Sequence, residues 1–475
     1  MAKTVLAFDF GASTGRAIKA TFDAGRLSYH EIHRFDNTPI EYDGKVCHDV
    51  DMILSEVKTA IEKAGRVDSL AFDTWGVDYG LIGTDGKLIC PPCHYRDERT
   101  ADILKTALKK LDADTLYRET GNQIMNINTL FQLLCEKELG KAETVLFMPD
   151  LFGYLLTGNK ACELSIASTS QMLNPVTADW SETVLDTYNI DKSLFAPLVS
   201  SGTVLGEYNG IKVVSVCGHD TQCAVCAMPT ASRNAAFLSC GTWSLLGCET
   251  EQPVLTAESR KSELSNELSG KGKVNYLKNI SGLWLIQETK RDYKKHGEDY
   301  SYNDLEMMAR DSEPFFCFID PDAPSLSAHG ELPEKIRAYC KKTGQPVPGS
   351  AGQLVRCIYE SLALKYRLAL EQISESTGKQ FDVLHLLGGG TKDGFLCEMT
   401  AKSLGIPVVA GPVEATALGN IMLQLIALGE VRDIEEARKI IAETQETKQY
   451  AFDRSEDWDK AYEKYKTILQ NNKEE

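Results

Sequence analysis

Apolar positions recur with two spacings along the first part of the chain, and each spacing predicts a type of element. Residues 4–10, 16–22 and 27–35 have the small and apolar character of short strands. Apolar residues then fall three and four positions apart over 50–61, which predicts an amphipathic helix. Residues 67–72 predict a further strand. The chain therefore opens with three hairpin strands, a helix and a strand.

A similar order returns in the second half of the chain. Residues 235–239 and 243–249 predict two strands joined by a small turn at 240–242. A long helix with one apolar stripe is predicted around residues 354–365, and a short apolar strand at 383–387. The recurrence predicts an internal duplication and therefore two related α/β domains.

The length of the chain also favours two domains, because 475 residues exceed what one hydrophobic core normally serves. Small and turn-forming residues cluster at 229–234, and we expect the boundary there. The predicted division is an N-terminal domain at 1–232, a C-terminal domain at 233–445 and a helical extension at 446–475.

Charge and composition limit the partners. Hydrophobic residues make up 43% of the chain, charged residues 25%, and the net charge is −17. An acidic surface repels nucleic acid and anionic lipid, so neither is an expected partner. The sequence shows no signal peptide and no apolar run of about 18 residues, which predicts a cytoplasmic protein that does not cross a membrane. It leaves open a monomer or a small homo-oligomer.

The chain has fourteen cysteines, and two pairs of them have a spacing that is typical of metal or haem sites. Cys90 and Cys93 precede a histidine as in c-type haem attachment, and Cys223 and Cys226 could complete a zinc site. We favour buried free thiols instead, because haem attachment normally needs export and residues 223–226 read as a buried helix.

Two glycine-containing turns follow strands at matching places in the two halves. In residues 9–16, Asp9 at a strand end and a turn of amides and hydroxyls suit a phosphate with magnesium, although a structural hairpin is equally typical of this pattern. Residues 239–244 form the second such turn. The chain contains no Walker-type Gly-Lys-Ser/Thr loop.

A third strand ends at Gly218 and is followed by His219 and Asp220. Ligands of open α/β sheets bind beyond the carboxyl ends of strands, where Asp220 could act as a general base toward a hydroxyl. Capping of the following helix by Asp220 is the alternative interpretation, and the sequence leaves both open.

Two further segments carry candidate binding groups. Residues 73–78 combine a tryptophan with carboxylates, which suits a sugar, while a buried core tryptophan is the alternative. Three glycines at 388–390 would let a flat ring such as adenine lie against the backbone. The residues at 411–420 are small enough for close helix packing.

In this order the segments resemble the FGGY carbohydrate kinases of the actin-like ATPase superfamily. The resemblance runs from about residue 4 to about residue 440 and rests on residues 9–16, 218–220, 239–244, 388–390 and 410–420. Other segments resemble the members that act on L-rhamnulose, namely residues 73–81, 94–100, 278–287 and 319–321.

The resemblance implies two actin-like (ribonuclease H-like) α/β domains with an active-site cleft between them. It implies a kinase that phosphorylates O1 of a small ketose with ATP and Mg²⁺, with L-rhamnulose the expected substrate. It assigns the proton-accepting role to Asp220 and metal binding to Asp9. The implied sugar site is Gly76, His219, Asp220, Thr221 and Asn279, and the implied nucleotide site is Ala12, Ser13, Thr14, Gly15, Arg16, Thr242, Gln287 and Gly389.

Kinases of fuculose or xylulose, and a chaperone or filament ATPase of the same superfamily, remain alternatives. The chain departs from the family pattern at two points. Asp393 replaces the usual Asn after the glycines, which predicts a negative charge near adenine and weaker nucleotide binding. Residues 47–49 lack a tryptophan that related members often have, and we expect an effect on packing only.

Overall fold

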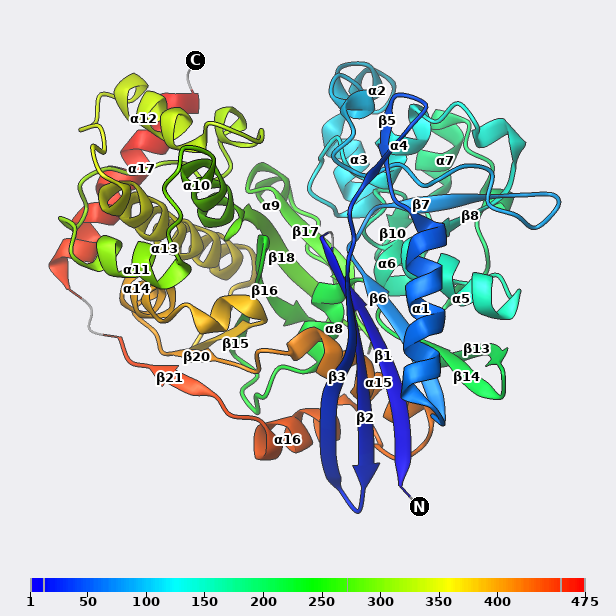
Figure 1. Ribbon diagram of the computed structural model, residues 1–475. Coiled ribbons are helices and arrows are strands. Elements are labelled where there is room, and N and C mark those ends of the chain that lie inside the picture. Colours follow the sequence, from blue (N-terminus) through cyan, green and yellow to red (C-terminus); the bar gives the residue numbers. More distant parts are fainter. Residues whose placement is uncertain (1, 12, 271, 453–454, 474–475) are drawn as a thin grey trace. The chain divides into compact units, whose positions relative to one another are not determined.

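The computed structural model describes residues 2–11, 13–270, 272–452 and 455–473 (Figure 1). Contacts between its residues divide the chain into two compact units, each assembled from segments that are separate in the sequence. The first unit comprises Met1–Thr230, Glu249–Leu277 and Glu414–Gln445, and the second comprises Ala231–Cys248, Lys278–Val413 and Glu446–Glu475.

The first unit is built on a six-stranded sheet of order β13-β14-β6-β1-β2-β3. β1 pairs antiparallel with β2 and parallel with β6, and β6 pairs parallel with β14. The opening hairpins and the strand near residue 70 are therefore confirmed. The strands are β1 (Lys3–Phe10), β2 (Thr14–Asp23), β3 (Arg26–Asp36), β6 (Ser69–Thr74), β13 (Thr203–Tyr208) and β14 (Ile211–Ser215).

Both faces of this sheet are covered because successive strand side chains point to opposite sides. Leu6, Phe8 and Phe10 of β1 belong to a large core cluster that also contains apolar residues of α1 (Val50–Ala64) and α5 (Met148–Thr157). On β6, Ala71 instead belongs to a second cluster with cysteines of α8 (Asp220–Cys226) and with Leu423 of α15 (Ala415–Ala427). Core packing on both faces of the sheet therefore holds the strand ends in place.

Shorter elements complete the first unit. They are β4 (Ile40–Tyr42), β5 (Lys45–Cys47), β7 (Tyr79–Gly83), α2 (Leu104–Lys110), α3 (Ala113–Thr120), α4 (Thr129–Leu134), β8 (Ala142–Phe147), β9 (Cys162–Glu163), α6 (Leu164–Ala167), β10 (Leu173–Asn174), β11 (Asp179–Trp180), α7 (Glu182–Tyr188), β12 (Leu198–Val199), α9 (Ala257–Lys261) and α16 (Ile434–Thr444).

The second unit contains most of a seven-stranded sheet of order β17-β18-β16-β15-β19-β20-β21. β15 pairs antiparallel with β16 and parallel with β19, which repeats the pairing of β1 with β2 and β6 and supports the predicted duplication. The strands are β15 (Ala235–Cys240), β16 (Trp243–Thr250), β17 (Leu264–Leu268), β18 (Val274–Ser281), β19 (Val383–Leu387), β20 (Val408–Ala410) and β21 (Lys448–Tyr450).

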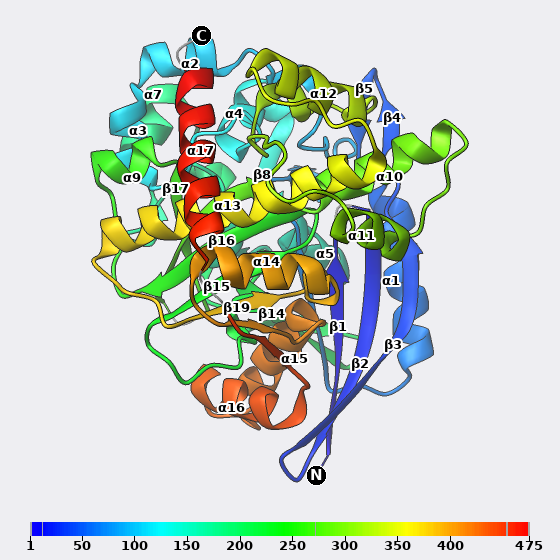
Figure 2. The same cartoon turned by 90° about the vertical axis from the view of Figure 1, so that its left-hand side faces the viewer.

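A long helix, α13 (Ala351–Thr377), organises the helical part of this unit. It contacts α11, α14 and α17, and Figure 2 shows α17 crossing it. The helix predicted around 354–365 is thus confirmed as α13, and α17 lies in the helical extension predicted at 446–475. The other helices are α10 (Trp284–Lys295), α11 (Tyr302–Arg310), α12 (Leu332–Lys342), α14 (Gly394–Leu404) and α17 (Glu456–Lys473).

Short 3₁₀ helices connect several of these elements. They are η1 (Glu98–Thr100), η2 (Leu139–Lys141), η3 (Lys192–Leu194), η4 (Pro324–Leu326) and η5 (Gly389–Lys392). Among the helices that the structure describes, none combines the length and the apolar composition needed to cross a bilayer.

Candidate active site

Neighbouring strands of the first unit bring three carboxyl groups to one edge of the sheet. Asp9 lies opposite Asp73 in the parallel pairing of β1 with β6. The backbone N–H of Thr74 donates to the carbonyl of Gly218 at 2.9 Å, two residues before Asp220. The edge is the carboxyl end of the parallel strands, where ligands of open α/β sheets bind.

Three carboxyl groups converge at this edge, where burial and mutual repulsion disfavour the ionisation of all three. Burial raises the pKa of Asp73 well above its usual range, and the charges of Asp9 and Asp220 raise it further. One Asp73 oxygen accepts from the amide of Asn420 at 2.7 Å, but Oδ1 is buried without a hydrogen-bond partner. An unpaired buried carboxylate oxygen among other carboxylates fits a cation or a proton.

The turn between β1 and β2 is closed by the backbone. The N–H of Gly11 donates to the carbonyl of Thr14 at 2.9 Å, and the N–H of Asn37 donates to that of Ser13 at 3.0 Å. Ser13 is exposed and Thr14 half-buried, so the turn presents hydroxyl groups to solvent. Ala12, which we predicted to contact nucleotide, lies outside the described residues.

Gly15 and Arg16, which follow this turn, have different roles. A Cβ atom on Gly15 would lie 2.1 Å from the ring of Phe35, so the close approach of β3 requires glycine. The guanidinium of Arg16 bonds to the carboxylates of Asp9 and Glu414, the latter at 2.5 Å. Arg16 is thus held beside the carboxylate edge, as a phosphate-binding cation would need to be.

Asp220 and its neighbours form a second polar group at this edge. His219 Nδ1 lies 2.7 Å from Oε2 of Glu267, which also accepts from the amide of Gln222 at 2.6 Å. The other ring nitrogen lies 3.4 Å from Oδ1 of Asp220. Asp220 begins α8 and accepts from the N–H of Thr221 at 2.5 Å, while the N-cap residue is His219. Asp220 is therefore not the helix cap, the alternative that the sequence left open.

Neighbouring carboxylates determine the protonation state of His219. Burial lowers the pKa of His219, but the carboxylates of Glu267 and Asp220 outweigh burial and raise it to about 9. His219 is consequently an imidazolium at neutral pH. Burial raises the pKa of Asp220, and the positive charge of His219 opposes that increase. The Asp220 side chain is 35% exposed, which leaves it accessible to a ligand.

Gly76, a predicted sugar-site residue, lies in a turn that a buried carboxylate fixes. A Cβ on Gly76 would lie 3.3 Å from a methyl group of Thr169. Asp78 accepts from the indole of Trp75 at 2.9 Å and from His48 at 2.8 Å. Trp75 and Asp78 are buried and bonded to each other, which agrees with the core tryptophan that the sequence left open as an alternative.

The matching turn of the second unit joins β15 to β16. Gly241 N–H donates to the carbonyl of Trp243 at 2.8 Å, and the carbonyl of Thr242 accepts from Gly282 and Trp284. Thr242 is half-buried. The turn is therefore tied to the start of α10, the helix that carries half-buried Gln287. Asn279 lies on β18 and is also half-buried.

The three glycines after β19 differ in their surroundings. A Cβ on Gly390 would lie 2.4 Å from the sulfur of Cys240, whereas a Cβ on exposed Gly389 would meet nothing within 4 Å. Gly390 is required by packing, and Gly389 is open to a ligand. The Asp393 carboxylate that follows accepts from the hydroxyl of Tyr359 at 2.5 Å and from the N–H of Leu396 at 3.0 Å. Asp393 therefore has a structural role as the N-cap of α14.

All fourteen cysteines are free thiols. Cys93 approaches Cys47 at 3.8 Å between sulfur atoms, and Cys226 approaches Cys217 at 3.9 Å. Each CxxC pair thus contacts a cysteine that belongs to neither pair. This agrees with our preference for free thiols over a zinc site shared by the two pairs.

Several site residues were not identified from the sequence. They are Asp73, which shares the carboxylate edge, Glu267, which charges His219, Glu414, which holds Arg16, and Asn420, which bonds to Asp73. Asp73, Glu414 and Asn420 stood in segments that we noted for other reasons, and Asp73 directly precedes the Thr74 that ends its strand.

Family comparisons agree with this organisation. The model of the N-terminal domain of the FGGY family of carbohydrate kinases matches residues 4–228, and that of the C-terminal domain matches residues 236–428. Solved structures with the same fold include gluconate kinase from Lactobacillus acidophilus (TM-score 0.79, 16% identity, 100% of this chain and 97% of that one). Plasmodium falciparum glycerol kinase with ADP has a TM-score of 0.76 at 14% identity, covering 99% and 98%.

The chain belongs to the FGGY family of carbohydrate kinases, and the predicted two-domain, actin-like α/β fold is confirmed. Relatives named rhamnulokinase are similar to almost the whole chain. The protein of that name from Bacteroides thetaiotaomicron is 38% identical over 99% of this chain and its whole own length. That from Enterococcus faecalis is also 38% identical, over 92% of each chain. The domain limits at 232 and 445 remain predictions.

Proposed function

We propose that this kinase transfers the γ-phosphoryl group of magnesium-ATP to the 1-hydroxyl of L-rhamnulose in the cytoplasm. The observation that carries the proposal is the partly exposed Asp220 carboxylate beside a cationic His219 at the strand ends. The relatives named rhamnulokinase, which match almost the whole chain, support the choice of sugar. The protein would act as a monomer or a small homo-oligomer.

Asp220 is the proposed general base. It would accept the proton of the 1-hydroxyl as that oxygen forms a bond to the γ-phosphorus, while the bond from the γ-phosphorus to the bridging oxygen breaks and ADP leaves with its electron pair. Burial raises the pKa of Asp220, and the nearby imidazolium of His219 opposes that increase and so favours the carboxylate form that a base needs. We assign Gly76, Thr221 and Asn279 to the sugar site with these two residues.

Asp9, with Asp73 beside it, is the proposed magnesium holder. The fit rests on the buried, unpaired Oδ1 of Asp73 and on the surplus of carboxylates, because magnesium prefers oxygen ligands. A bound magnesium ion would neutralise charge on the phosphate oxygens. Arg16 is the proposed cation for the transferred group.

The nucleotide would contact both small turns. We assign to it Ala12, Ser13, Thr14, Gly15 and Arg16 of the first turn and Thr242, Gln287 and Gly389 of the second unit. The open space at Gly389 supports close approach of a flat ring. Asp393 does not weaken this assignment, since its carboxylate is engaged by Tyr359 and Leu396.

The test is a coupled ADP-release assay at fixed magnesium-ATP with L-rhamnulose, L-fuculose, L-xylulose, D-xylulose, L-ribulose and glycerol. We expect L-rhamnulose to give the highest kcat/KM. A sugar with an inverted hydroxyl leaves buried polar groups unpaired, and a sugar that lacks only the methyl loses about 1–3 kcal/mol.

A tenfold preference for any other sugar would contradict the substrate while leaving the kinase class intact. ADP release that no sugar accelerates would instead favour the chaperone or filament ATPase alternative. The same reaction with magnesium-ATP and no added sugar is the baseline for both comparisons.

A further inference from the structure

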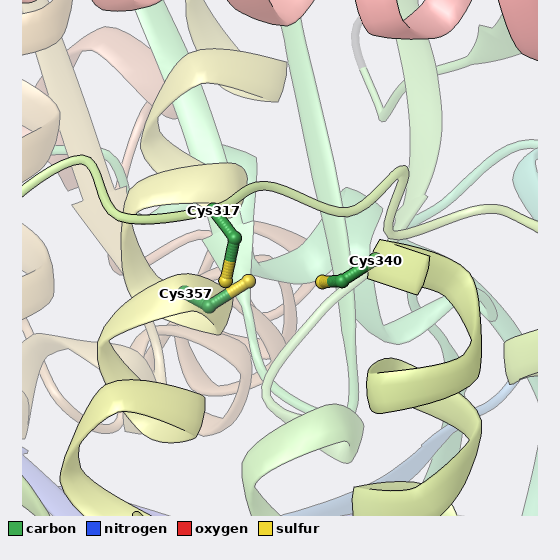
Figure 3. A group of neighbouring side chains, drawn as sticks. All are labelled: Cys317, Cys340 and Cys357. Atoms are coloured by element: carbon green, nitrogen blue, oxygen red, sulfur yellow. The ribbon is translucent and has the colours of Figure 1, made fainter. Parts of the chain in front are cut away.

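Three cysteines that are far apart in the sequence meet inside the second unit. Cys317 lies on the segment after α11, Cys340 on α12 and Cys357 on α13. Their sulfur atoms all lie within 4.8 Å of one another. Figure 3 shows the three side chains directed toward one another. All three residues are buried, with 0%, 0% and 2% of their surfaces exposed.

We infer that Cys317, Cys340 and Cys357 form a binding site for one soft, thiophilic metal ion, of the kind that Cu(I) represents. The site lies outside the proposed kinase machinery and does not depend on the proposed substrate.

The sulfur positions fit such an ion. With metal–sulfur bonds of about 2.3 Å, three sulfurs around a trigonal ion lie about 4 Å apart. The observed separations of up to 4.8 Å would need only small changes of side-chain torsion to reach that spacing. Sulfur ligands of this kind select soft ions over magnesium or calcium.

Buried cysteines often serve only as small apolar side chains, and the other thiol contacts noted above join two sulfurs. Here three sulfur atoms converge from three separate segments of the chain, and all three residues are buried. Such a convergence offers one ion several soft ligands at once, which a contact between two thiols does not.

Within the part of the chain that the structure describes, no fourth histidine, cysteine or carboxylate joins the three sulfurs, and the nearest charged groups have other partners. Glu360, one turn after Cys357, accepts from Arg356 at 2.7 Å and from the N–H of Phe315 at 2.8 Å. The ammonium group of Lys464 lies 5.3 Å from the ring of Phe318, the residue next to Cys317. Structural zinc normally takes four protein ligands, so three thiolates favour an ion that is stable with three.

A bound metal ion would connect α12, α13 and the segment that carries Cys317, which an ion pair already joins to α13. Asp320 and Asp322, shortly after Cys317, accept from Lys365 of α13 at 2.8 and 2.9 Å. Because a metal that binds only the folded state stabilises it, the bound ion should raise the melting temperature.

The test uses the full-length protein, purified and stripped of metal under anaerobic, reducing conditions. Cu(I) is titrated in competition with a chromophoric chelator, and the copper environment is measured by X-ray absorption. We expect one equivalent of Cu(I) with three sulfur ligands and a rise in melting temperature. Two sulfur ligands, no binding in competition with the chelator, or a disulfide within the trio in protein prepared without reductant would overturn the inference.

Cys340→Ala removes one ligand, and Cys248→Ala removes an equally buried cysteine that is not in the cluster. We expect Cys340→Ala to weaken Cu(I) binding by more than the roughly 10–100-fold typical of a lost supporting contact. Cys248→Ala should bind as the parent does. Circular dichroism checks that each variant folds, and the absorption spectrum of the parent decides the question if Cys340→Ala does not. Unchanged affinity in Cys340→Ala would overturn the inference.

Discussion

Replacing Glu267 by Gln tests the charge relation on which the proposed active site depends. Glu267 is buried, and its carboxylate contacts His219 Nδ1 at 2.7 Å. The substitution keeps the size of the side chain and removes its charge. We expect the pKa of His219 to fall, because burial then acts against the imidazolium with only the charges of Asp220 and Glu163 in opposition.

The magnitude follows from the two pKa values of His219. Its folded-state pKa is about 9 and its ordinary value is 6.5. The difference corresponds to about 3 kcal/mol of unfolding free energy. Since the folded pKa is the higher one, this stabilisation is complete below about pH 6.5 and is lost as the pH rises through about 9. Most of it therefore remains at pH 7, and little of it at pH 9.

Urea unfolding at a series of pH values between 6 and 9.5 measures this dependence. We expect Glu267→Gln to destabilise the protein by about 2–3 kcal/mol near pH 7 and by much less near pH 9. Glu249→Gln is the matched control, because its partner Arg438 stays charged throughout and its cost should not vary with pH. Equal destabilisation by Glu267→Gln at all pH values, or a His219 resonance that titrates near 6.5 in the parent, would refute the reasoning.

Two other substitutions test the proposed roles directly. Asp220→Asn should lower kcat by about 10²–10⁴ while calorimetry still detects sugar binding, and near-normal turnover would exclude Asp220 as the base. Gly389→Ala should fold normally and raise the KM for ATP by about tenfold, because its Cβ points into open space. Gly390→Ala, its matched neighbour, should instead destabilise the fold by about 1–3 kcal/mol through contact with Cys240. An unchanged KM in Gly389→Ala would mean that the nucleotide does not approach there.

The strands that carry the site were predictable because their signals are local. The apolar run at 4–10 ends in Asp9 and a glycine turn, and the structure has β1 and its hairpin there. The same holds for β19 and the glycines that follow it. In each case a few consecutive residues determine both the strand and where it stops.

The side chains that pair with the site residues were not predictable, because they lie far from those residues in the sequence. Arg16 pairs with Glu414, which is 398 positions away, and His219 pairs with Glu267, 48 positions away. No spacing rule links such residues, because the fold rather than the local chain brings them together. The three-cysteine cluster was missed in the same way, since none of its members belongs to a CxxC pair.

Asp393 illustrates a different limit. Its position after the glycines suggested a charge facing the nucleotide, but a residue's place in a sequence does not fix the direction of its side chain. Burial raises the pKa of Asp393, and the hydrogen bonds from Tyr359 and Leu396 oppose that increase. An aspartate that begins a helix commonly serves as its N-cap, and this ordinary role accounts for the substitution.

The charges around the proposed catalytic centre explain how an acidic protein can handle an anionic nucleotide. Five carboxyl groups, those of Asp9, Asp73, Asp220, Glu267 and Glu414, accompany two cations, Arg16 and His219. Fully ionised, this group would carry three surplus negative charges in a largely buried environment, and burial together with the neighbouring carboxylates raises the pKa of Asp73, which favours a proton there. A divalent cation can take the place of that proton, because it supplies charge where the carboxylates converge. The same arrangement that repels an unaccompanied nucleotide would therefore favour one that arrives with magnesium.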